Sequence, residues 1–562
     1  MKQNKPSVKA SPLHAHSAIS HATAPARAPA QAPRTTTAAS PTHATLATPR
    51  TTARSFPLLE IAVFTCGAML MAFELVGSRM LGPFLGTSMY VWTSVIGIIL
   101  GAMSLGYWYG GRVADKNHSF KQFAFLIFAS AVTIGITLLI KDLLLAFLQG
   151  AIPSLKLNSI IASLTLFAPT AFILGMVSPY AVKLKMADLS KSGRTVGNLY
   201  AISTFGSIFG TFITGFYLIP YLGTAKTTLL ICIILTVLAI ILSFKSLRFV
   251  QASKFIALFT FASLLVANVF ANTGSSYFYR PFGLIADVDT EYNRVWIKHD
   301  TVKPSNRPIR MMMFDPFGIQ SAMFEDKDDD LVLTYAKYFR LDKHFVPNMQ
   351  KSLIIGGAAY SYPKDFLDKH DTATLDVVEI DPGLTALARQ YFNLKDDPRL
   401  NIFHEDGRAF LNTTKNKYDT IYIDAFNSLF VPYQLATKEA VQKMYDLLNP
   451  DGAVFVNIVS SFEGESSDFL RAELATYKSV FPHVYIFDVK NPEDRNSVTS
   501  ISLIALKSTN APNFISTDYE TQKMLNSLYK KEIPNDLPVL TDDLAPVDMY
   551  IEKIVQAVAE RI

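Results

Sequence analysis

The sequence predicts a multi-span α-helical membrane domain, then a small β domain, then an α/β domain. The 52 Lys and Arg and 47 Asp and Glu are unevenly distributed, with net charges of +7 over 1–55, +9 over 56–272 and −11 over 273–562. Long apolar runs fill the second stretch, and strand-like runs alternate with helical patterns in the third. A single soluble domain is therefore excluded. A disulfide scaffold is also excluded, because the only cysteines, Cys66 and Cys232, lie in apolar runs.

The first 55 residues consist mainly of Ala, Thr, Pro, Ser and His, with seven Lys and Arg and no acid. They have no apolar periodicity and cannot bury a core, so we predict a disordered low-complexity tail over 1–55. An acid-free, Arg-containing composition also fits an organelle transit peptide, which stays open as an alternative. The four histidines of this stretch are irregularly spaced, and we predict no metal site.

Apolar runs of membrane-spanning length follow over 56–272. They lie near 58–80, 89–110, 122–140 (or to 149), 158–180, 197–221, 226–244 and 253–271. We therefore predict about seven membrane helices. Gly106 and Gly110, and again Gly206 and Gly210, form GxxxG pairs that predict close helix packing.

Two charged residues, Glu74 and Arg79, lie inside or at the edge of the first predicted span. An ionisable group in hydrocarbon is costly and is usually paired. We interpret the two as a structural ion pair, or Arg79 as reaching the membrane interface. A substrate or proton site is the alternative.

Loop charges predict an orientation. The loops after the second, fourth and sixth spans carry ten Lys and Arg, whereas the alternate loops carry four. The positive-inside rule places the basic loops and the tail in the cytoplasm. With seven spans, residues 273–562 would then lie outside. A double crossing by 122–149, or a surface position for 253–271, would reverse this result.

Residues 273–562 predict two soluble domains. The segments 292–298, 309–314 and 318–323 are typical of strands and predict a small β domain over 273–345. Strand-like runs at 352–357, 374–380, 400–404, 418–426 and 452–459 then alternate with helical patterns such as 382–392 and 438–448. This alternation predicts a parallel, doubly wound α/β sheet over 346–562.

Polar and glycine residues follow four successive strands of this sheet, where ligands bind. Gly356 and Gly357 end the first strand and allow close backbone approach to a ligand. Glu379 ends the second, where a carboxylate suits a ribose diol. Asp406 ends the third, where it suits an adenine amine or caps the next helix, and Asp424 ends the fourth. No G-x-G-x-x-G motif is present, so we predict a site for a nucleoside without pyrophosphate.

Several segments resemble the spermidine synthase family of polyamine aminopropyltransferases. They are EYNRVWI (291–297), FGIQSAM (317–323), LIIGGAAY (353–360), VVEIDP (377–382), DPRLNIFHEDGRAFL (397–411) and YDTIYIDAF (418–426). Other segments are similar to the membrane-fused branch of that family: FELVGSRMLGPFLGTS (73–88), GYWYGGRVAD (106–115), GNLYAISTFGSIFG (197–210) and LTDDLAPVD (540–548). The resemblance implies a methyltransferase-like Rossmann domain after the small β domain.

The resemblance implies a donor site for decarboxylated S-adenosylmethionine, which acts as a co-substrate, with no permanently bound cofactor. Glu379 would bind the ribose hydroxyls. Asp406, followed by Gly407, would bind the adenine amine. Gly356 and Gly357 would line the thioether side.

The resemblance also implies an acceptor site. Asp424 matches the first acid of an Asp-x-x-Asp motif beside the reacting centre and is the implied catalytic residue. It would accept the proton of the attacking amine and orient the nitrogen. Gln320 and Tyr335 match polar positions that face the substrates, and Asn427 stands at the second acid of the motif.

The chain departs from the family pattern on the acceptor side. Ala358 and Ala359 replace a glycine and an acid of the family's glycine loop. Asn427 replaces an acid, and Lys337 stands where an acid is expected after Tyr335. The nucleoside half of the site is kept while several amine-holding carboxylates are missing, which weakens putrescine as the acceptor.

Three functions follow from these observations. The first is transfer of an aminopropyl group to a putrescine-like amine, giving spermidine or a related polyamine and methylthioadenosine. The second is S-adenosylmethionine-dependent methylation. The third is a nucleoside- or polyamine-binding transporter or sensor without turnover.

The expected partners are a small amine substrate and the lipid bilayer. The resemblance implies a homodimer through the soluble domains. Nucleic-acid binding is disfavoured, because the only acid-free basic stretch is the tail. We expect a multi-pass protein of the inner (plasma) membrane. Adenosyl donors are cytosolic, which favours a cytoplasmic soluble domain, whereas the loop charges favour the opposite side.

Overall fold

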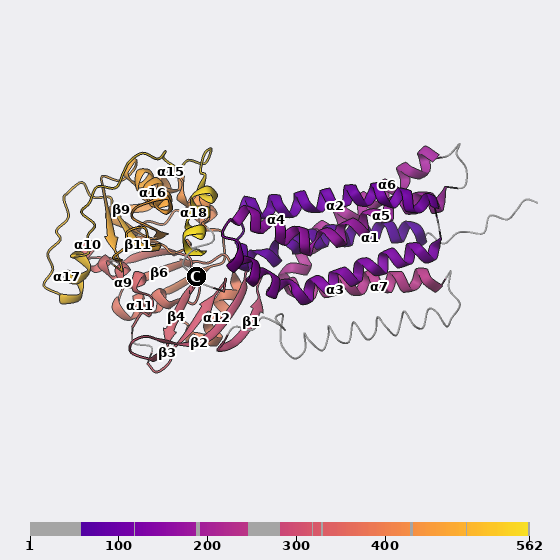
Figure 1. Ribbon diagram of the computed structural model, residues 1–562. Coiled ribbons are helices and arrows are strands. Elements are labelled where there is room, and N and C mark those ends of the chain that lie inside the picture. The colour runs from indigo at the N-terminus through magenta and orange to yellow at the C-terminus, as the bar shows by residue number, and fades with distance from the viewer. Residues whose placement is uncertain are drawn as a thin grey trace, which may run out of the picture. The chain divides into compact units, whose positions relative to one another are not determined.

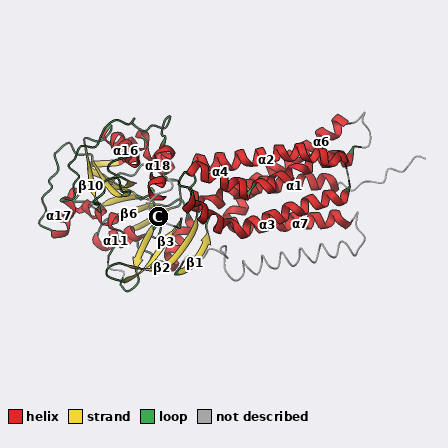
Figure 2. Cartoon of the chain, in the orientation of Figure 1, coloured by secondary structure: helices red, strands yellow, loops and turns green. Residues whose placement is uncertain are grey.

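The computed structural model describes residues 58–559, except 117–118, 187–191, 245–281, 317, 328–329, 427–430 and 491. The predicted tail over 1–55 and the predicted span at 253–271 lie outside these residues, so both stay predictions. Along the chain a helical part precedes two sheets with their helices (Figure 1). Figure 2 distinguishes the all-helical part from the part that holds every described strand.

The helical part confirms the prediction of a multi-span membrane domain. Its helices are α1 (Leu58–Leu85), α2 (Met89–Lys116), α3 (Phe120–Ala151), α4 (Leu155–Leu166), α5 (Ala168–Lys185), α6 (Ser192–Ile213), η2 (Thr214–Leu218) and α7 (Ile219–Phe244). Four continuous helices among the described residues are long and apolar enough to cross a membrane, and the pair α4–α5, bent by 51°, would be a fifth.

The helix over Ser192–Ser243 and the helix α3 can be compared with the predicted spans at 197–221, 226–244 and 122–149. The longest runs over Ser192–Ser243, and non-helical backbone at Gly223 (φ 77°) breaks it. Its first part, α6, packs on α1, and its second part, α7, packs on α3. Residues 122–149 lie within the single helix α3, so a double crossing by this segment is excluded.

The GxxxG pairs pack helices closely, as predicted. A Cβ on Gly106 would lie 2.2 Å from the carbonyl oxygen of Phe172 on α5, and one on Gly110 would lie 2.6 Å from Cα of Met176. A Cβ on Gly206 would likewise lie 2.0 Å from the carbonyl oxygen of Phe64 on α1. These contacts bring the α2 backbone against α5 and the α6 backbone against α1.

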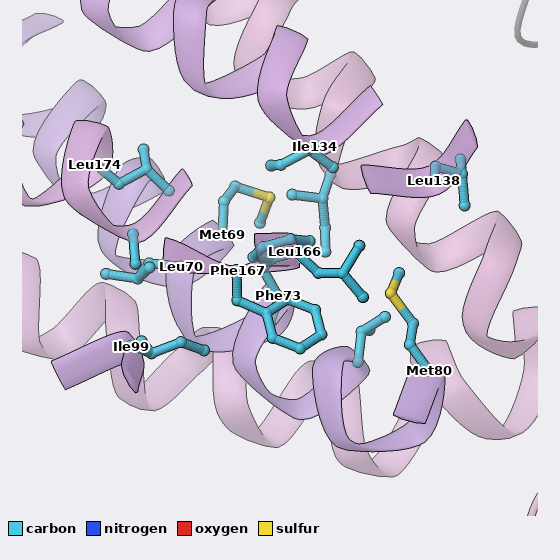
Figure 3. Close-up of a cluster of buried hydrophobic side chains, with 14 of the residues drawn as sticks. Met69, Leu70, Phe73, Met80, Ile99, Ile134, Leu138, Leu166, Phe167 and Leu174 are labelled. Atoms are coloured by element: carbon cyan, nitrogen blue, oxygen red, sulfur yellow. The ribbon is translucent and has the colours of Figure 1, made fainter. Parts of the chain in front are cut away.

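Large apolar side chains fill the space between the helices (Figure 3). Phe167, at the break between α4 and α5, packs edge-on against Phe73 of α1 with ring centroids 5.5 Å apart. Ile99 of α2 and Ile134 of α3 are fully buried in the same cluster. The bent helix pair therefore belongs to the packed bundle.

The ends of the bundle differ in their contacts. At one end Lys183, at the end of α5, pairs with Asp115 near the end of α2 at 2.8 Å. At the other end the N–H of Thr224 donates to Asp289 of the first strand at 2.9 Å. The basic last turns of α2 and α5, which carry Lys116, Lys183 and Lys185, therefore lie at the end away from the strands.

A four-stranded antiparallel sheet follows, in the order β1-β2-β3-β4. Its strands are β1 (Leu284–Asp289), β2 (Arg294–Val302), β3 (Arg307–Met313) and β4 (Ser321–Phe324). The last three were predicted, and β1 was not. Val295 and Met312 of this sheet pack with Leu384 and Leu387 of α12 (Pro382–Tyr391), which places the sheet beside the larger one.

The larger sheet has seven strands in the order β10-β11-β9-β8-β5-β6-β7. They are β5 (Lys351–Ile355), β6 (Thr374–Val378), β7 (Leu400–Phe403), β8 (Tyr418–Ile423), β9 (Leu448–Ser460), β10 (His483–Asp488) and β11 (Thr499–Leu506). The pairs among β5, β6, β7, β8 and β9 are parallel, as predicted. Two further strands that were not predicted extend the sheet at one edge, where β11 is antiparallel to both β9 and β10.

Helices cover both faces of this sheet, which confirms the doubly wound α/β class. Ile355 of β5 lies in one buried cluster and Ile354 in the other, since successive side chains of a strand point to opposite faces. The remaining helices are α9 (Thr334–Lys337), η3 (Tyr338–Leu341), α10 (Asp342–Phe345), α11 (Ser361–Lys369), α13 (Gly407–Thr413), α14 (Tyr433–Ala436), α15 (Lys438–Leu447), η4 (Glu465–Ser467), α16 (Asp468–Lys478), α17 (Tyr519–Leu525) and α18 (Val547–Ala559).

Candidate active site

The order of strands in the large sheet reverses beside β5. The chain builds outward through β5, β6 and β7, then returns to place β8 on the other side of β5. The loops after β5 and β8 therefore run in opposite directions and leave a crevice, which is where ligands bind in such sheets. Gly356 follows β5 and Asp424 follows β8, so two of the predicted residues lie at this point.

The loop after β5 lies against the backbone of Asp424. Gly356 has φ 100°, and a Cβ at this position would lie 2.5 Å from the carbonyl oxygen of Asp424. The N–H of Asp424 donates to the carbonyl of Ile355 at 2.9 Å. A larger residue at 356 would meet both a steric clash and an unfavourable backbone conformation. Glycine is therefore required for this contact.

Two polar side chains hold the carboxylate of Asp424. Asn457 of β9 donates from Nδ2 to Oδ1 at 3.3 Å, and the Tyr335 hydroxyl donates to Oδ2 at 3.2 Å. Burial raises the pKa of Asp424 to about 7, while the hydrogen bonds from Asn457 and Tyr335 act in the opposite direction. A carboxylate with a pKa near neutrality is suited to accept a proton from a substrate.

Backbone amides hold the carboxylate of Glu379, which is 5% exposed. Its Oε2 accepts from the N–H groups of Gly357 at 2.8 Å and Ala358 at 3.0 Å. Its Oε1 accepts from the N–H of Asp381 at 2.9 Å. Burial raises the pKa of Glu379, and these three hydrogen bonds oppose that rise. A carboxylate has about four acceptor positions, so the Oε1 side retains capacity for a ligand hydroxyl.

Asp406 caps the next helix, which was one of its two predicted roles. Its Oδ1 accepts from the N–H of Ala409 at 3.0 Å, at the start of α13. Gly407 is buried, and a Cβ there would lie 2.6 Å from the Ile355 side chain of β5. This contact brings the start of α13 against the strand that carries the glycine loop.

A small hollow lies beside Asp424. It is lined by Ser321, Ala322, Leu331, Val332, Leu333, Tyr335, Ala336, Ile354, Gly356, Gly357, Ala358, Ser361, Tyr362, Pro363 and Asp424. The structure therefore brings four predicted residues, Gly356, Gly357, Tyr335 and Asp424, into one lining.

Other predicted residues do not line this hollow. Glu379 contacts it only through the amides of Gly357 and Ala358. Gln320 follows Ile319, and its N–H donates to Met312 of β3 at 2.9 Å, but its side chain is not part of the lining. Asn427 lies outside the described residues.

Three polar residues near Asp424 were not predicted. Asn457 is 4% exposed and interrupts the apolar run GAVFVNIV, which was the one signal of its role. Ser321 and Ser361 line the hollow, and their hydroxyls are 2.8 Å apart. Small hydroxyl residues are common throughout the chain, so the sequence contained no signal for this pair.

Comparison with known proteins identifies the domain that contains these residues. Residues 340–511 match the family model "Spermine/spermidine synthase domain". The chain carries a spermine/spermidine synthase domain. This synthase domain includes every strand from β5 to β11, and with them Gly356, Glu379, Asp406 and Asp424.

Curated relatives extend the likeness beyond the synthase domain. The polyamine aminopropyltransferase of Vibrio vulnificus (strain CMCP6) is 27% identical over 231 residues, which is 40% of this chain and 73% of that protein. Polyamine aminopropyltransferase 1 of Streptomyces coelicolor (strain ATCC BAA-471 / A3(2) / M145) is 23% identical over 434 residues, which is 72% of this chain and 76% of that protein. Residues 273–562 number only 290, so the second match reaches into the helical part.

A solved structure described as a probable spermidine synthase from Corynebacterium glutamicum ATCC 13032 is also similar. It has a TM-score of 0.36 and 19% sequence identity, over 44% of this chain and 86% of that chain. The family model and the names of the curated relatives confirm the predicted enzyme class, polyamine aminopropyltransferase.

Proposed function

We propose that this protein transfers an aminopropyl group from decarboxylated S-adenosylmethionine to an amine and releases methylthioadenosine. The observation that carries the proposal is the position of Asp424. It ends β8 at the strand-order reversal, has a pKa of about 7, and lines a hollow together with Gly356 and Gly357. A proton acceptor thus lies beside the loop that suits the adenosyl donor.

In the proposed reaction the amine nitrogen attacks the aminopropyl carbon next to the sulfonium. The new C–N bond forms as the C–S bond breaks, and the bonding electron pair stays on sulfur, giving the neutral thioether. The acceptor is an ammonium ion at neutral pH, since alkylamines have a pKa of about 10. Asp424 accepts the proton that the nitrogen loses, and Tyr335 and Asn457 keep its two oxygens in place.

The remaining predicted residues have supporting roles in this proposal. Glu379 binds a ribose hydroxyl through Oε1, and Asp406 with Gly407 lies beside the adenine. Gly356 and Gly357 lie along the thioether. The family resemblance assigns Gln320 and Asn427 to the acceptor side, in addition to Tyr335. Decarboxylated S-adenosylmethionine is the co-substrate, with no permanently bound cofactor.

The test uses the purified full-length protein with each donor and a panel of amines, with mass spectrometry of the products. We expect decarboxylated S-adenosylmethionine to yield methylthioadenosine and an aminopropylated amine. Formation of S-adenosylhomocysteine from S-adenosylmethionine would instead support the methyltransferase alternative. Ligand binding without consumption of either donor would support the transporter or sensor alternative.

For localisation we propose a multi-pass plasma-membrane protein whose synthase domain faces the cytoplasm, where adenosyl donors are made. The basic last turns of α2 and α5 lie at the far end of the bundle, which by the positive-inside rule favours the opposite orientation. A reporter fused after Ile562 and active on one side only would decide between the two. The homodimer implied by the resemblance stays a prediction, tested by the mass of the protein in nanodiscs.

A further inference from the structure

Arg79 lies near the end of helix α1 that meets the strands. It does not pair with Glu74, contrary to one predicted interpretation. Its guanidinium instead donates from Nη1 to the carbonyl of Glu291 at 2.6 Å and from Nη2 to the carbonyl of Thr290 at 3.0 Å. Both carbonyls belong to residues 290–293, the turn between β1 and β2. A membrane helix therefore holds this β1–β2 turn.

The bundle also holds both ends of the β1–β2 turn. Asp289, the last residue of β1, accepts through Oδ2 from the N–H of Thr224 on α7 at 2.9 Å. Arg294, the first residue of β2, donates to Asp142 of α3 at 2.7 Å. Three helices of the bundle thus fix the turn, two at its ends and α1, through Arg79, between them.

Hydrogen bonds inside the turn keep its shape. The N–H of Thr290 donates to the carbonyl of Asn293 at 2.7 Å, and the N–H of Asn293 donates to the hydroxyl oxygen of Thr290 at 2.9 Å. Hydrogen bonds of this kind lock the rotamers of the side chains that take part in them. A contact that fixes the backbone of Thr290 therefore also fixes the Thr290 hydroxyl.

The turn binds Asp381, a fully buried acid at the start of α12. Its Oδ2 accepts from the Thr290 hydroxyl and, at 3.0 Å, from Nδ2 of Asn293. Its Oδ1 accepts from the N–H of Gly383 at 3.0 Å. The packing here is close, since a Cβ on Gly383 would lie 2.6 Å from Cγ2 of Thr290. The turn and the start of α12 therefore form one packed unit.

Asp381 in turn holds Glu379. The N–H of Asp381 donates to Oε1 of Glu379 at 2.9 Å, and this is the oxygen that retains capacity for a ribose hydroxyl. Hydrogen bonds therefore run from Arg79 through the β1–β2 turn and Asp381 to the carboxylate of Glu379.

A second residue of the turn lies close to the donor side. Burial, followed by the nearby carboxylates of Glu291, Asp381 and Asp406, raises the pKa of Tyr292. The turn is therefore near Asp406 at the end of β7 as well as Asp381 after β6.

We infer that Arg79 is a positioning residue for the nucleoside half of the donor site. The inference rests on the aminopropyl transfer proposed above, in which Glu379 binds the ribose. Without Arg79 the turn loses two hydrogen bonds to the bundle, and Glu379 is less well ordered before the ligand binds, which costs affinity. The effect falls on the donor and not on proton transfer, because Asp424 is held separately by Asn457 and Tyr335.

The experiment measures methylthioadenosine affinity of the full chain in detergent by calorimetry, which requires no turnover. Arg79→Met keeps the aliphatic length and removes the donors, and we expect it to weaken binding at least about fivefold. Arg79→Lys can reach one carbonyl and should restore part of the affinity. The KM for the donor should rise in Arg79→Met, while kcat at saturating donor stays within about twofold of wild type.

Lys156→Ala is the matched control. It removes another basic contact between the bundle and the soluble part, the ion pair of Lys156 on α4 with Glu552 on α18 at 2.9 Å. This contact does not involve the β1–β2 turn, so the affinity for methylthioadenosine should equal that of wild type.

A double-mutant cycle tests whether Arg79 acts through the turn. Thr290→Val removes the hydroxyl that binds Asp381 and should also weaken methylthioadenosine binding. Because the two residues lie on one route, the loss in Arg79→Met/Thr290→Val should be smaller than the product of the two single losses. A loss equal to or greater than that product overturns the inference.

Wild-type affinity in Arg79→Met also overturns the inference and leaves the transferase function intact. If thermal unfolding shows that Arg79→Met does not fold, Arg79→Gln, with a shorter polar side chain, takes its place with the same expectation. A wild-type protein that neither binds methylthioadenosine nor consumes the donor overturns the proposed function as well.

Discussion

Arg294 of β2 donates from Nη1 to Oδ1 of Asp142 on helix α3 at 2.7 Å, with both side chains less than a tenth exposed. Lys141 donates to the same oxygen at 2.7 Å, and Arg294 also binds Asp287 of β1 through Nε and Nη2 at 3.0 and 2.9 Å. Two acids and two bases are thus buried together where the small sheet meets the bundle.

Asp142→Asn is expected to destabilise the protein strongly. It leaves Lys141 and Arg294 buried beside a single acid, and removal of one partner from a buried pair costs about 3–5 kcal/mol. Thermal unfolding in detergent measures the loss. Asp115→Asn is the matched control, because its ion pair with Lys183 is exposed and contributes at most about 1 kcal/mol. Equal melting temperatures of Asp142→Asn and Asp115→Asn would contradict a structural role for the buried cluster.

Asp424→Asn is expected to lower kcat by about 10²–10⁴-fold, since a positioned proton acceptor contributes on that order. The amide keeps the shape of the side chain, so methylthioadenosine affinity should stay within about twofold of wild type. Donor consumption and calorimetry check the two parts. Normal turnover in this variant would remove Asp424 from the proposed mechanism.

The rate is expected to fall as the pH drops below about 7, because protonated Asp424 cannot accept the amine proton. Asn457→Leu and Tyr335→Phe each remove a hydrogen bond to the ionised carboxylate, so each should raise the pKa of Asp424. The fall in rate on the acidic side should then begin at a higher pH in both variants. Profiles of kcat against pH for wild type and both variants are the measurement. If the acidic fall in rate occurs at the same pH in both variants as in wild type, it is caused by the titration of another group.

Burial of Asp424 also predicts how stability depends on pH. Its pKa in the folded protein, about 7, is above the ordinary 3.8, so folding favours the protonated form. The contribution of Asp424 to the free energy of unfolding is therefore fully present below about pH 4 and is lost as the pH rises through 7. Asp424→Asn should therefore reduce the change in melting temperature between pH 4 and pH 7 relative to wild type, since the other titrating groups are the same in both proteins. An unchanged slope would show that Asp424 ionises in the folded state as readily as in the unfolded state.

Two adjacent glycines of α2 test the close helix packing. A Cβ on Gly110 would lie 2.6 Å from the α5 backbone, whereas a Cβ on Gly111 would meet nothing within 4 Å. Gly110→Leu should therefore reduce folded yield and melting temperature, because the helices cannot approach. Gly111→Leu changes the same helix by the same residue and should behave like wild type. Similar losses in both variants would indicate a general effect of leucine in α2.

Local patterns in the sequence predicted much of the fold. Helices with one buried face have a strong periodicity, so α12 and α15 were predicted to within about one residue. The strands β1, β10 and β11 were missed. The antiparallel position of β11 depends on a chain return that residue periodicity does not record.

The sequence by itself determined the order of the helical, small β and α/β parts along the chain, the glycine and acidic residues at the strand ends and the GxxxG contacts. These depend on local spacing and on side-chain chemistry. Only the tertiary structure decided the partners of those residues. Asn457 reaches Asp424 because β8 and β9 are neighbours, and Arg79 binds the turn before β2 instead of Glu74. Hydrogen bonds and ion pairs act over a few ångströms, and residues more than 200 positions apart come within that range only when the chain folds.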